Sequence, residues 1–383
     1  MRVFLIAGEV SGDSLGAALM AGLKDLVPDV SFDGVGGAQM QAEGLQSRFP
    51  MDELSVMGLA EILPKYRALK ARISQTAQAV IDTGPDVLIT IDSPDFCLRV
   101  ARRVKAARDI RTVHYVAPTV WAWRAGRAEK MAQVIDHVLA LFPFEPPFMT
   151  AAGMECDFVG HPVVAQPVAT PQDAQAFRAA YGLGDAPVML VLPGSRHGEV
   201  SRLSPVFARA VTPVLAARPD LRIVIPAAAP VAAAVRSRVA DWPGAPIVLD
   251  PRQMSADVAA TTKRAAFGAA DLALAASGTV SLELAAAGTP MVIAYDMNWL
   301  SRQIITRMLR VDSVTLVNLV SDTRVVPEFI GADCLPERIG ASLLQVLADP
   351  TAQQAAMRTT MERLGQGGEP PGLRAARAVL ARM

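Results

Sequence analysis

The amino-acid sequence predicts an α/β protein made of two doubly wound halves, each a parallel sheet covered by helices on both faces. Short apolar runs rich in β-branched residues alternate with longer segments of helical periodicity, which is the pattern of repeated βαβ units. Several of these runs are apolar at consecutive positions, as expected for parallel strands buried on both faces. At 383 residues the chain is too long for one compact core, so we expect two domains.

The individual elements follow from the two periodicities. We predict strands at residues 2–7, 31–36, 86–91, 111–116, 137–141, 156–159, 187–192, 221–225, 246–249, 271–275 and 290–294. We predict helices at residues 13–26, 60–82, 95–108, 200–217, 230–240, 278–287, 298–309, 336–348 and 350–364, with a short last helix after the break QGGEPPG.

The best domain boundary lies near residues 160–172 (GHPVVAQPVATPQ), where three prolines and several small residues interrupt both periodicities. A new apolar run and glycine-containing turn follow directly. We therefore predict an N-terminal Rossmann-like domain at residues 1–165 and a second one at residues 166–345. The terminal helices, residues 346–383, are expected to cross back to the first domain.

Composition argues against several classes of protein. Lys plus Arg and Asp plus Glu number 37 each, so no overall positive field indicates a nucleic-acid partner. The three cysteines share no metal-ligand spacing, which favours a reduced, cytoplasmic protein. Neither a secretory signal peptide nor an apolar run of the ~20 residues that span a bilayer is expected. Any membrane association would therefore be peripheral.

The first predicted strand leads into AGEVSGDSLG, residues 7–16, whose glycines and position suggest a phosphate-binding turn. The turn also carries two carboxylates, Glu9 and Asp13, which would repel a phosphate. Ser11 and Asp13 are placed to cap the following helix.

A second pair of carboxylates ends a buried strand in ITIDSPDF, residues 89–96. Asp92 follows apolar residues at the carboxyl end of the strand, so it needs a partner or serves as a base. Asp95 precedes a helical pattern and can be a simple N-cap. The chain contains no D-x-D motif, which argues against a metal-dependent sugar-nucleotide site.

Two turns in the second half are candidates for binding an anion. LPGSRHGE, residues 192–199, has a tight turn at Gly194 and Ser195, with N–H groups expected to face outward, and Arg196 as an anion donor. The alternative is an ordinary turn with a surface arginine.

The second candidate is ASGTVSLELAAAGTP, residues 276–290. Here Ser277, Gly278 and Thr279 precede a helix whose N-terminus offers free N–H groups, and Glu283 lies one turn later, suited to a ribose diol. The alternative is a capping box between Thr279 and Glu283.

Two further stretches suit a glycolipid. Trp121, Trp123 and Arg124 in HYVAPTVWAWRAGRAEKM combine aromatic faces with a guanidinium, although an aromatic wedge between domains fits equally.

The second stretch is ELSVMGLAEILPKY, residues 53–66, which is by default an amphipathic helix packed on a sheet. Its apolar residues Met57, Leu59 and Ile62 are followed by basic ones, so the stretch also suits acyl chains or an anionic membrane.

Taken together, these motifs resemble the lipid-A-disaccharide synthase family of glycosyltransferases with the two-domain GT-B architecture. The matching pieces run in the family's order from end to end: AGEVSGD, SVMGLAEIL, IDSPDF, HYVAPTVWAWR, FPFE, FVGHP, LPGSR, ASGTVSLE, TPMVIAY and NLVSDTRVVPEF. HYVAPTVWAWR and the ordered set are the most specific parts of this resemblance, which covers nearly the whole chain.

The resemblance implies an inverting transfer from UDP-2,3-diacylglucosamine to 2,3-diacylglucosamine 1-phosphate (lipid X), giving the β-1,6 lipid A disaccharide 1-phosphate and UDP. It implies an active site in a cleft between the two domains, no cofactor and no metal. It further implies peripheral association with the cytoplasmic side of the inner membrane, where the arginine-rich residues 99–111 would also help. A homodimer is one expectation.

The same resemblance assigns roles to residues. Asp92 matches the catalytic base, with Asp95 as the alternative, and Arg196 matches an arginine near the donor phosphates. Gly194, Ser195, Ser277, Gly278, Thr279 and Glu283 fall in the donor site, as do Asn318 and Glu328 of the late motif. On the acceptor side, the loop of Glu9, Ser11 and Asp13 would meet sugar hydroxyls, and Met57, Leu59, Ile62, Trp121, Trp123 and Arg124 would meet lipid or sugar.

Two other functions remain open from the sequence. A UDP-sugar 2-epimerase has the same two halves but needs no apolar acceptor surface. A non-catalytic UDP-sugar or glycolipid-binding protein would bind its ligand without releasing UDP.

Overall fold

The structure, a computed structural model, describes residues 1–54, 59–122, 126–297 and 311–383, without the side chains of residues 59–66. Contacts divide the chain into two compact units. Unit 1 consists of residues 1–165 together with 364–383, and unit 2 consists of residues 166–363. The terminal segment that the sequence predicts as one piece, residues 346–383, is therefore divided between the two units.

Unit 1 is built on a parallel sheet whose six described strands lie in the order β2-β1-β3-β4-β5-β6. Its central strand β3, Val87–Ile91, is buried at every position, and four of its five residues are apolar. Alternate side chains point to opposite faces, so both faces can bury apolar residues under helices. The strands are β1 (Arg2–Ala7), β2 (Ser31–Val35), β3 (Val87–Ile91), β4 (Arg111–Tyr115), β5 (His137–Ala140) and β6 (Glu155–Phe158).

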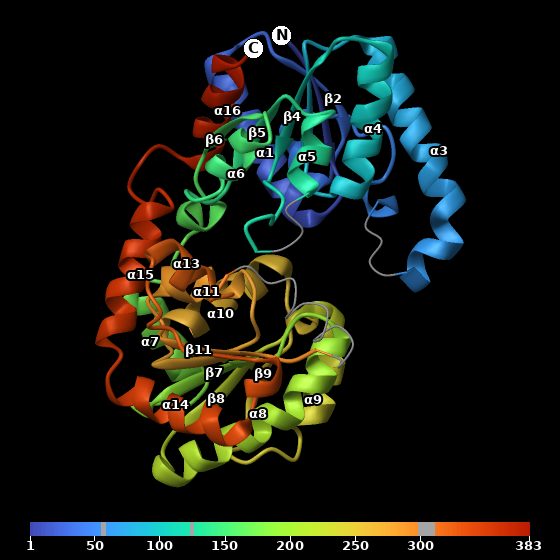
Figure 1. Ribbon diagram of the computed structural model, residues 1–383. Coiled ribbons are helices and arrows are strands. Elements are labelled where there is room, and N and C mark those ends of the chain that lie inside the picture. The colour runs from blue at the N-terminus through green and yellow to red at the C-terminus, as the bar shows by residue number, and fades with distance from the viewer. Residues whose placement is uncertain (55–58, 123–125, 298–310) are drawn as a thin grey trace. The chain divides into compact units, whose positions relative to one another are not determined.

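Helices cover both faces of this sheet (Figure 1). On one face, Phe4, Ile6 and Leu88 pack with apolar residues of the helices α3 and α4 in a continuous core. On the other face, Ile91 lies against the helix α1 at Gly12. The described helices of unit 1 are α1 (Val10–Leu26), α2 (Ala38–Ala42), α3 (Leu59–Thr83), α4 (Pro94–Ala107), α5 (Arg127–Ala132), α6 (Pro146–Ala151) and α16 (Pro371–Ala381).

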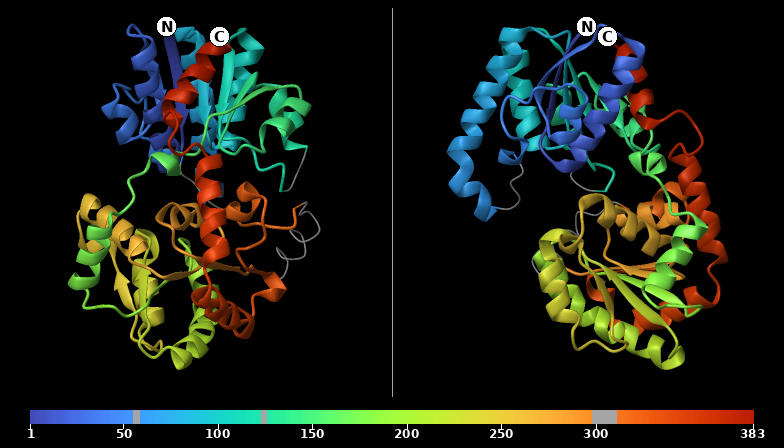
Figure 2. Two further views of the ribbon diagram at one scale, coloured as in Figure 1. Left: turned by 90° about the vertical axis from the view of Figure 1, so that its left-hand side faces the viewer. Right: turned by 180° about the vertical axis from the view of Figure 1, so that it is seen from behind.

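The last helix, α16, lies beside the first, α1, so the two chain ends come together in unit 1 (Figure 2). Glycine makes this close approach possible. A Cβ added at Gly372 would lie 2.4 Å from the backbone oxygen of Ala18, and one added at Gly22 would lie 2.8 Å from that of Gly372. Neither oxygen can move without separating the helices, so both positions require a glycine.

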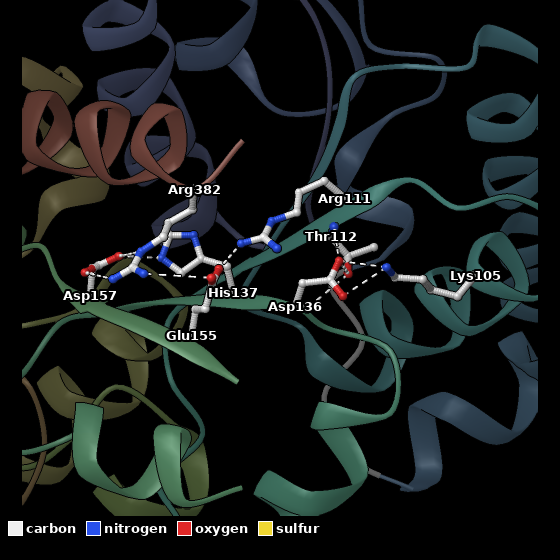
Figure 3. Close-up of polar contacts among 8 residues, drawn as sticks. All are labelled: Lys105, Arg111, Thr112, Asp136, His137, Glu155, Asp157 and Arg382. Carbon is white, nitrogen blue, oxygen red and sulfur yellow. Dashed lines mark hydrogen bonds and ion pairs between the residues drawn. The ribbon is translucent and has the colours of Figure 1, made fainter. Parts of the chain in front are cut away.

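Charged side chains fasten α16 to the sheet as well (Figure 3). Arg382 donates two hydrogen bonds to Asp157 of β6, at 3.1 and 3.2 Å. The Asp157 carboxylate also lies 2.9 Å from Nε2 of His137, a fully buried side chain on β5. Burial lowers the pKa of His137 more than the neighbouring Asp157 raises it. The ends of strands β5 and β6 and the end of the chain are thus held in one polar cluster.

Unit 2 repeats the same architecture with a second parallel sheet, in the order β12-β11-β10-β7-β8-β9 among the described strands. Met189 and Val191 of β7 pack with apolar residues of α8, α9 and α14 in its core. The strands are β7 (Val188–Leu192), β8 (Arg222–Pro226), β9 (Ile247–Leu249), β10 (Leu272–Ala275), β11 (Met291–Tyr295) and β12 (Glu328–Ile330).

The helices of unit 2 again lie on both faces of its sheet (Figure 1). On the side opposite α8 and α14, the buried side chain of Gln353 exchanges two hydrogen bonds with the backbone of Met291, which joins α15 to β11. The described helices are α7 (Pro171–Ala180), α8 (His197–Ala217), α9 (Ala232–Val239), α10 (Ala256–Gly268), α11 (Val280–Ala287), α13 (Leu316–Ser321), α14 (Pro336–Ala348) and α15 (Thr351–Arg363).

Each sheet contains one point where the strand order reverses. In unit 1, β1 lies between β2 and β3, and Ala7 pairs with Ile91. In unit 2, β7 lies between β8 and β10, and Leu192 pairs with Ala275. Ligands of open α/β sheets bind at the carboxyl ends of the strands at such points. The loops found there are AGEVSGD and IDSPDF in unit 1, and LPGSR and ASGT in unit 2.

The predicted fold class of two doubly wound halves is confirmed, and all the strands predicted from the sequence are present within a few residues. The prediction missed the three-residue edge strand β12 and several helices, among them α7 and α10. Their sequences are rich in alanine and polar residues, with no strong apolar stripe. The helix predicted at residues 298–309 lies outside the described residues.

The contact between α1 and α16 predicts that Gly372→Ala destabilises unit 1. Alanine gains up to about 1 kcal/mol in helix propensity, but overpacking against backbone atoms costs about 1–3 kcal/mol, so the net effect is a lower free energy of unfolding. Urea denaturation of the full chain measures it. Gly126→Ala is the control, because among the described residues its new Cβ would meet nothing nearer than Glu129 Oε2, at 3.8 Å. Equal stability of both variants would contradict this account of the helix contact.

Candidate functional site

A cavity of ≈ 660 Å³ opens at the carboxyl ends of β7, β8, β9 and β10 in unit 2. Its position is the point where the strand order of this sheet reverses. One part of its lining is polar and comes from the turns after β7 and β10 and from α10, and the other part is apolar. The polar lining includes Gly194, Ser195, Arg196, Glu199, Thr262, Lys263, Ser277, Gly278, Thr279 and Glu283, and the apolar lining includes Pro226, Ala227, Ala228, Leu249, Pro251 and Met254.

The turn after β10 presents backbone donors to this cavity. Within the described residues, the N–H groups of Ser277, Gly278, Thr279 and Val280 have no hydrogen-bond acceptor. They lie at the N-terminus of α11, where the helix dipole adds partial positive charge. The capping-box alternative is wrong, since Thr279 makes no side-chain cap. This turn is a ready anion-binding site.

The turn after β7 differs from the prediction in one respect. Its N–H groups do not face outward, because the Glu199 side chain folds back and accepts hydrogen bonds from Ser195 N and Arg196 N at 3.0 and 3.3 Å. Glu199 also bonds Arg196 Nη1 at 3.0 Å. Gly194 has φ +114, and a Cβ there would lie 2.5 Å from Glu199 Oε2. The Glu199 carboxylate thus engages the backbone donors Ser195 N and Arg196 N of this turn, and the exposed Arg196 guanidinium lines the cavity beside it.

Glu283 is paired across the cavity with a residue that the sequence analysis did not single out. Its Oε2 lies 2.5 Å from Nζ of Lys263, which comes from α10. Both side chains line the cavity. Each of the two cationic side chains of the lining, Arg196 and Lys263, therefore has an acidic partner in the lining, Glu199 and Glu283 respectively.

The apolar wall is held by a buried carboxylate between β9 and α10. Asp250 accepts hydrogen bonds from the backbone N and from Nε and Nη2 of Arg252, at 3.1, 2.9 and 2.6 Å. These bonds lower the pKa of Asp250 to about 2. They fix the 3₁₀ turn Pro251–Gln253, which brings Pro251 and Met254 to the cavity.

The reversal point of unit 1 holds the other group of predicted residues. Asp13 is 4% exposed and accepts three hydrogen bonds, from Gly37 N at 2.8 Å, Gln39 N at 2.9 Å and Met40 N at 3.0 Å. It therefore caps α2, and the predictions that it caps its own helix or faces a sugar are wrong. Glu9 is half-buried directly before α1, and Ser11 is exposed on its first turn.

Backbone strain is concentrated beside this loop. Five non-glycine residues of the described chain have positive φ, and three of them, Asp92, Ser93 and Val116, directly follow β3 and β4. Such conformations cost about 1–3 kcal/mol each and often occur at functional sites. Asp92 is half-buried, and its Oδ1 accepts a bond from Ser93 N at 2.9 Å. Asp95 is exposed in the first turn of α4 and makes no cap.

A buried carboxyl group joins two motifs of unit 1. Glu145, the last residue of FPFE, is 2% exposed and accepts bonds from Leu141 N and Phe142 N, both at 3.0 Å. Trp121 Nε1 donates to its other oxygen at 3.3 Å. Burial raises the pKa of Glu145 to about 7, although the three hydrogen bonds act in the opposite direction. The Trp121 ring also packs edge-on against Phe144, with the centroids 5.1 Å apart.

Comparison with known proteins assigns the chain to a family. A model of the family described as "Lipid-A-disaccharide synthetase" matches residues 3–377. The chain belongs to this family. Curated lipid-A-disaccharide synthases of Ruegeria pomeroyi and Rhodospirillum centenum are 68% and 47% identical, covering 100% and 99% of this chain and 96% and 94% of their own. The chain is therefore an enzyme of the glycosyltransferase class.

Solved structures of low sequence identity share the fold. A UDP-GlcNAc 2-epimerase from Neisseria meningitidis bound to UDP-GlcNAc has a TM-score of 0.62 at 11% identity, covering 100% of this chain and 99% of its own. MurG of Acinetobacter baumannii has a TM-score of 0.54 at 16% identity, with 100% and 99% covered. The predicted GT-B fold class is thereby confirmed for this member of the lipid-A-disaccharide synthetase family.

Other predicted residues of this synthetase family member lie elsewhere. Asn318 and Glu328 do not line the unit 2 cavity. Asn318 Nδ2 donates to Glu328 at 2.8 Å and to Val326 O at 2.9 Å, and its Oδ1 accepts from Val326 N. Glu328 also accepts from Val314 N at 2.9 Å. This pair fixes the loop between α13 and β12.

Several acceptor-side predictions cannot be placed. Met57, Trp123 and Arg124 lie outside the described residues, as do the side chains of Leu59 and Ile62. Among the helices of the described residues, none is long and apolar enough to cross a membrane.

The residues that the sequence analysis missed have weak local signals. Glu199 follows Arg196 by three positions, which is the spacing of a capping box. This spacing is the sequence feature that could have predicted the contact of Glu199 with the turn. Lys263 lies in an alanine-rich helix whose sequence shows no marked pattern. Its partner is 20 positions away, and only the tertiary structure brings them together.

The raised pKa of Glu145 predicts a specific pH dependence of stability. A carboxyl group whose pKa rises from 4.5 to about 7 on folding stabilises the protein fully below pH 4.5, and this contribution is lost as the pH rises through about 7. The glutamine side chain in Glu145→Gln cannot ionise, so the variant should not lose stability through this group as the pH rises. Relative to the wild type, the variant should gain about 1–3 kcal/mol between about pH 5 and pH 8.

Urea denaturation of the wild type and of Glu145→Gln at these two pH values measures the difference in the free energy of unfolding. Glu129→Gln removes an exposed carboxylate of the same unit and is the control. If the two variants respond to pH in the same way, burial of Glu145 does not govern this part of the profile.

Proposed function

We propose that this chain transfers 2,3-diacylglucosamine from its UDP derivative to the 6-hydroxyl of 2,3-diacylglucosamine 1-phosphate, releasing UDP and forming the β-1,6-linked disaccharide 1-phosphate. The observation that carries the donor half of this proposal is the set of four N–H groups at residues 277–280, which belong to the lining of the unit 2 cavity and have no acceptor among the described residues. Membership of the lipid-A-disaccharide synthetase family supports the remainder.

The unit 2 cavity offers a place for each part of a UDP group. The diphosphate binds at the N-terminus of α11 and to the Arg196 guanidinium, because both supply positive charge. The ribose hydroxyls donate to Glu283, one turn further along the helix. The uracil ring packs against the apolar wall around Pro226 and Met254. During reaction the same donors stabilise the charge that develops on the departing diphosphate.

In unit 1, Asp92 is the proposed general base. It removes the proton of the acceptor 6-hydroxyl while the oxygen attacks the anomeric carbon from the side opposite to the diphosphate. The bond to UDP breaks in the same displacement, so the α linkage of the donor becomes a β linkage. Support comes from the strained backbone at Asp92, the bond of one of its carboxylate oxygens to Ser93 N, and its half-buried position.

An assay of UDP release with and without the acceptor tests the proposed reaction. Mass analysis then identifies the product. Acceptor-dependent release with formation of the disaccharide is expected. Epimerisation of UDP-N-acetylglucosamine without use of an acylated acceptor would identify an epimerase instead. UDP binding without any release would identify a binding protein.

The assignment of Asp92 predicts that Asp92→Asn lowers turnover by about 10²–10⁴-fold, the usual contribution of a general base, with unchanged affinity for UDP. Asparagine adopts the left-handed conformation as readily as aspartate, so the backbone at φ +52 is retained. Asp95→Asn is the matched control and tests the alternative base. Turnover close to normal in Asp92→Asn would remove this residue from the mechanism.

The assignment of Arg196 predicts a loss of about 2–4 kcal/mol of transition-state stabilisation in Arg196→Ala, as for one preorganised donor. The ratio kcat/KM for the donor measures it. Arg202→Ala serves as the control, because Arg202 lies in the helix that directly follows Arg196 but outside the cavity lining. A change below about threefold would exclude Arg196 from the site.

We further propose that the enzyme works at the cytoplasmic surface of the inner membrane, since both substrates carry acyl chains. Arg99, Arg102, Arg103 and Arg108 are exposed on α4 or directly after it, and such a basic surface is attracted to anionic lipid. Arg99→Gln together with Arg102→Gln should reduce sedimentation with phosphatidylglycerol vesicles and leave phosphatidylcholine vesicles unaffected. Equal sedimentation with both lipids would exclude this surface.

A further inference from the structure

The ion pair between Lys263 and Glu283 lies within the proposed donor site and is not needed to hold the fold. Lys263 Nζ is 2.5 Å from Glu283 Oε2, and the two side chains are 44% and 34% exposed. Exposed pairs of this kind contribute little to the stability of a protein. A ligand that offers better partners can therefore separate them at little cost.

The position of the pair explains why its separation by a ligand would affect the binding of an anion. Glu283 lies in the first turn of α11, and helical side chains lean toward the N-terminus, which brings its carboxylate toward the four free N–H groups at residues 277–280. Two like charges held close together near a protein surface repel each other. Without Lys263, Glu283 would oppose an anion at these N–H groups.

The stem of Lys263 is also held in place. Its Nζ lies 5.3 Å from the centre of the Phe267 ring, one turn further along α10. The buried Phe267 ring thus gives the ammonium group a second partner beside Glu283. The other cation of the described lining, Arg196, is bonded to Glu199, so each of these two cationic side chains has an acidic partner.

We propose that Lys263 is a phosphate-binding residue of the donor site and that it exchanges partners when the nucleotide binds. In the empty site its ammonium group neutralises Glu283. In the occupied site the ammonium group donates to a phosphate oxygen of the nucleotide, and the Glu283 carboxylate accepts from the ribose hydroxyls. Lys263 thereby makes the site selective for a nucleoside diphosphate over a nucleoside. This inference rests on the proposed function of the cavity.

Calorimetric titration of the full-length protein with UDP and with uridine tests the exchange. In Lys263→Met, the affinity for UDP should fall by about 10- to 100-fold, the loss expected for one hydrogen bond between charged groups. The affinity for uridine should stay the same or rise, because Glu283 is then free to bind the ribose. Lys263→Arg keeps the charge and should retain most of the affinity for UDP.

Lys24→Met is the matched control. Lys24 is 43% exposed and forms an ion pair with Glu43 in unit 1, so its removal should change neither affinity. Thermal unfolding of each variant verifies that the fold is retained.

Each remaining outcome has a definite meaning. An equal loss of UDP and uridine affinity in Lys263→Met would mean that Lys263 only positions Glu283, and would overturn the inference. Unchanged affinity for both ligands would overturn it as well, while leaving the proposed function intact. Failure of the wild type to bind UDP would overturn the proposed donor site and this inference together.

Discussion

Both candidate sites depend on the point in each parallel sheet where successive connections leave toward opposite faces. In unit 2, the chain leaves β7 for β8 on one side and returns through β10 on the other. The loops after these two strands therefore diverge and leave an opening above the sheet. The residues following β7 and β10, and those following β1 and β3 in unit 1, are thus brought together by topology alone.

The two openings are equipped with different chemistry. In unit 2, the backbone supplies the positive potential, through N–H groups at residues 277–280 that are fixed before any ligand arrives, while Arg196 and Lys263 are each balanced by an acid. In unit 1, the opening holds a half-buried carboxylate on strained backbone, Asp92. The backbone donors and the strained carboxylate thus belong to different sheets.

Much of the fold was predictable, because buried parallel strands give continuous apolar runs and both sheets consist of them. The candidate donor-side turn at Ser277–Thr279 was also predictable, because the geometry of the turn is set by its immediate neighbours in the sequence. The role of Asp13 was not, because its three N–H partners lie 24 to 27 positions later. The same is true of the contacts of Glu328, which supports a loop through Asn318 and Val314.

The packing of α16 on α1 also has a consequence for synthesis of the protein. Unit 1 contains residues 1–165 but is completed only by residues 364–383. While the ribosome adds the intervening residues, the face of α1 that carries Gly22 has no helix to cover it. The nascent N-terminal unit thus exposes a groove of small residues until translation ends, and a chain shortened by its last helix would retain that exposed groove permanently.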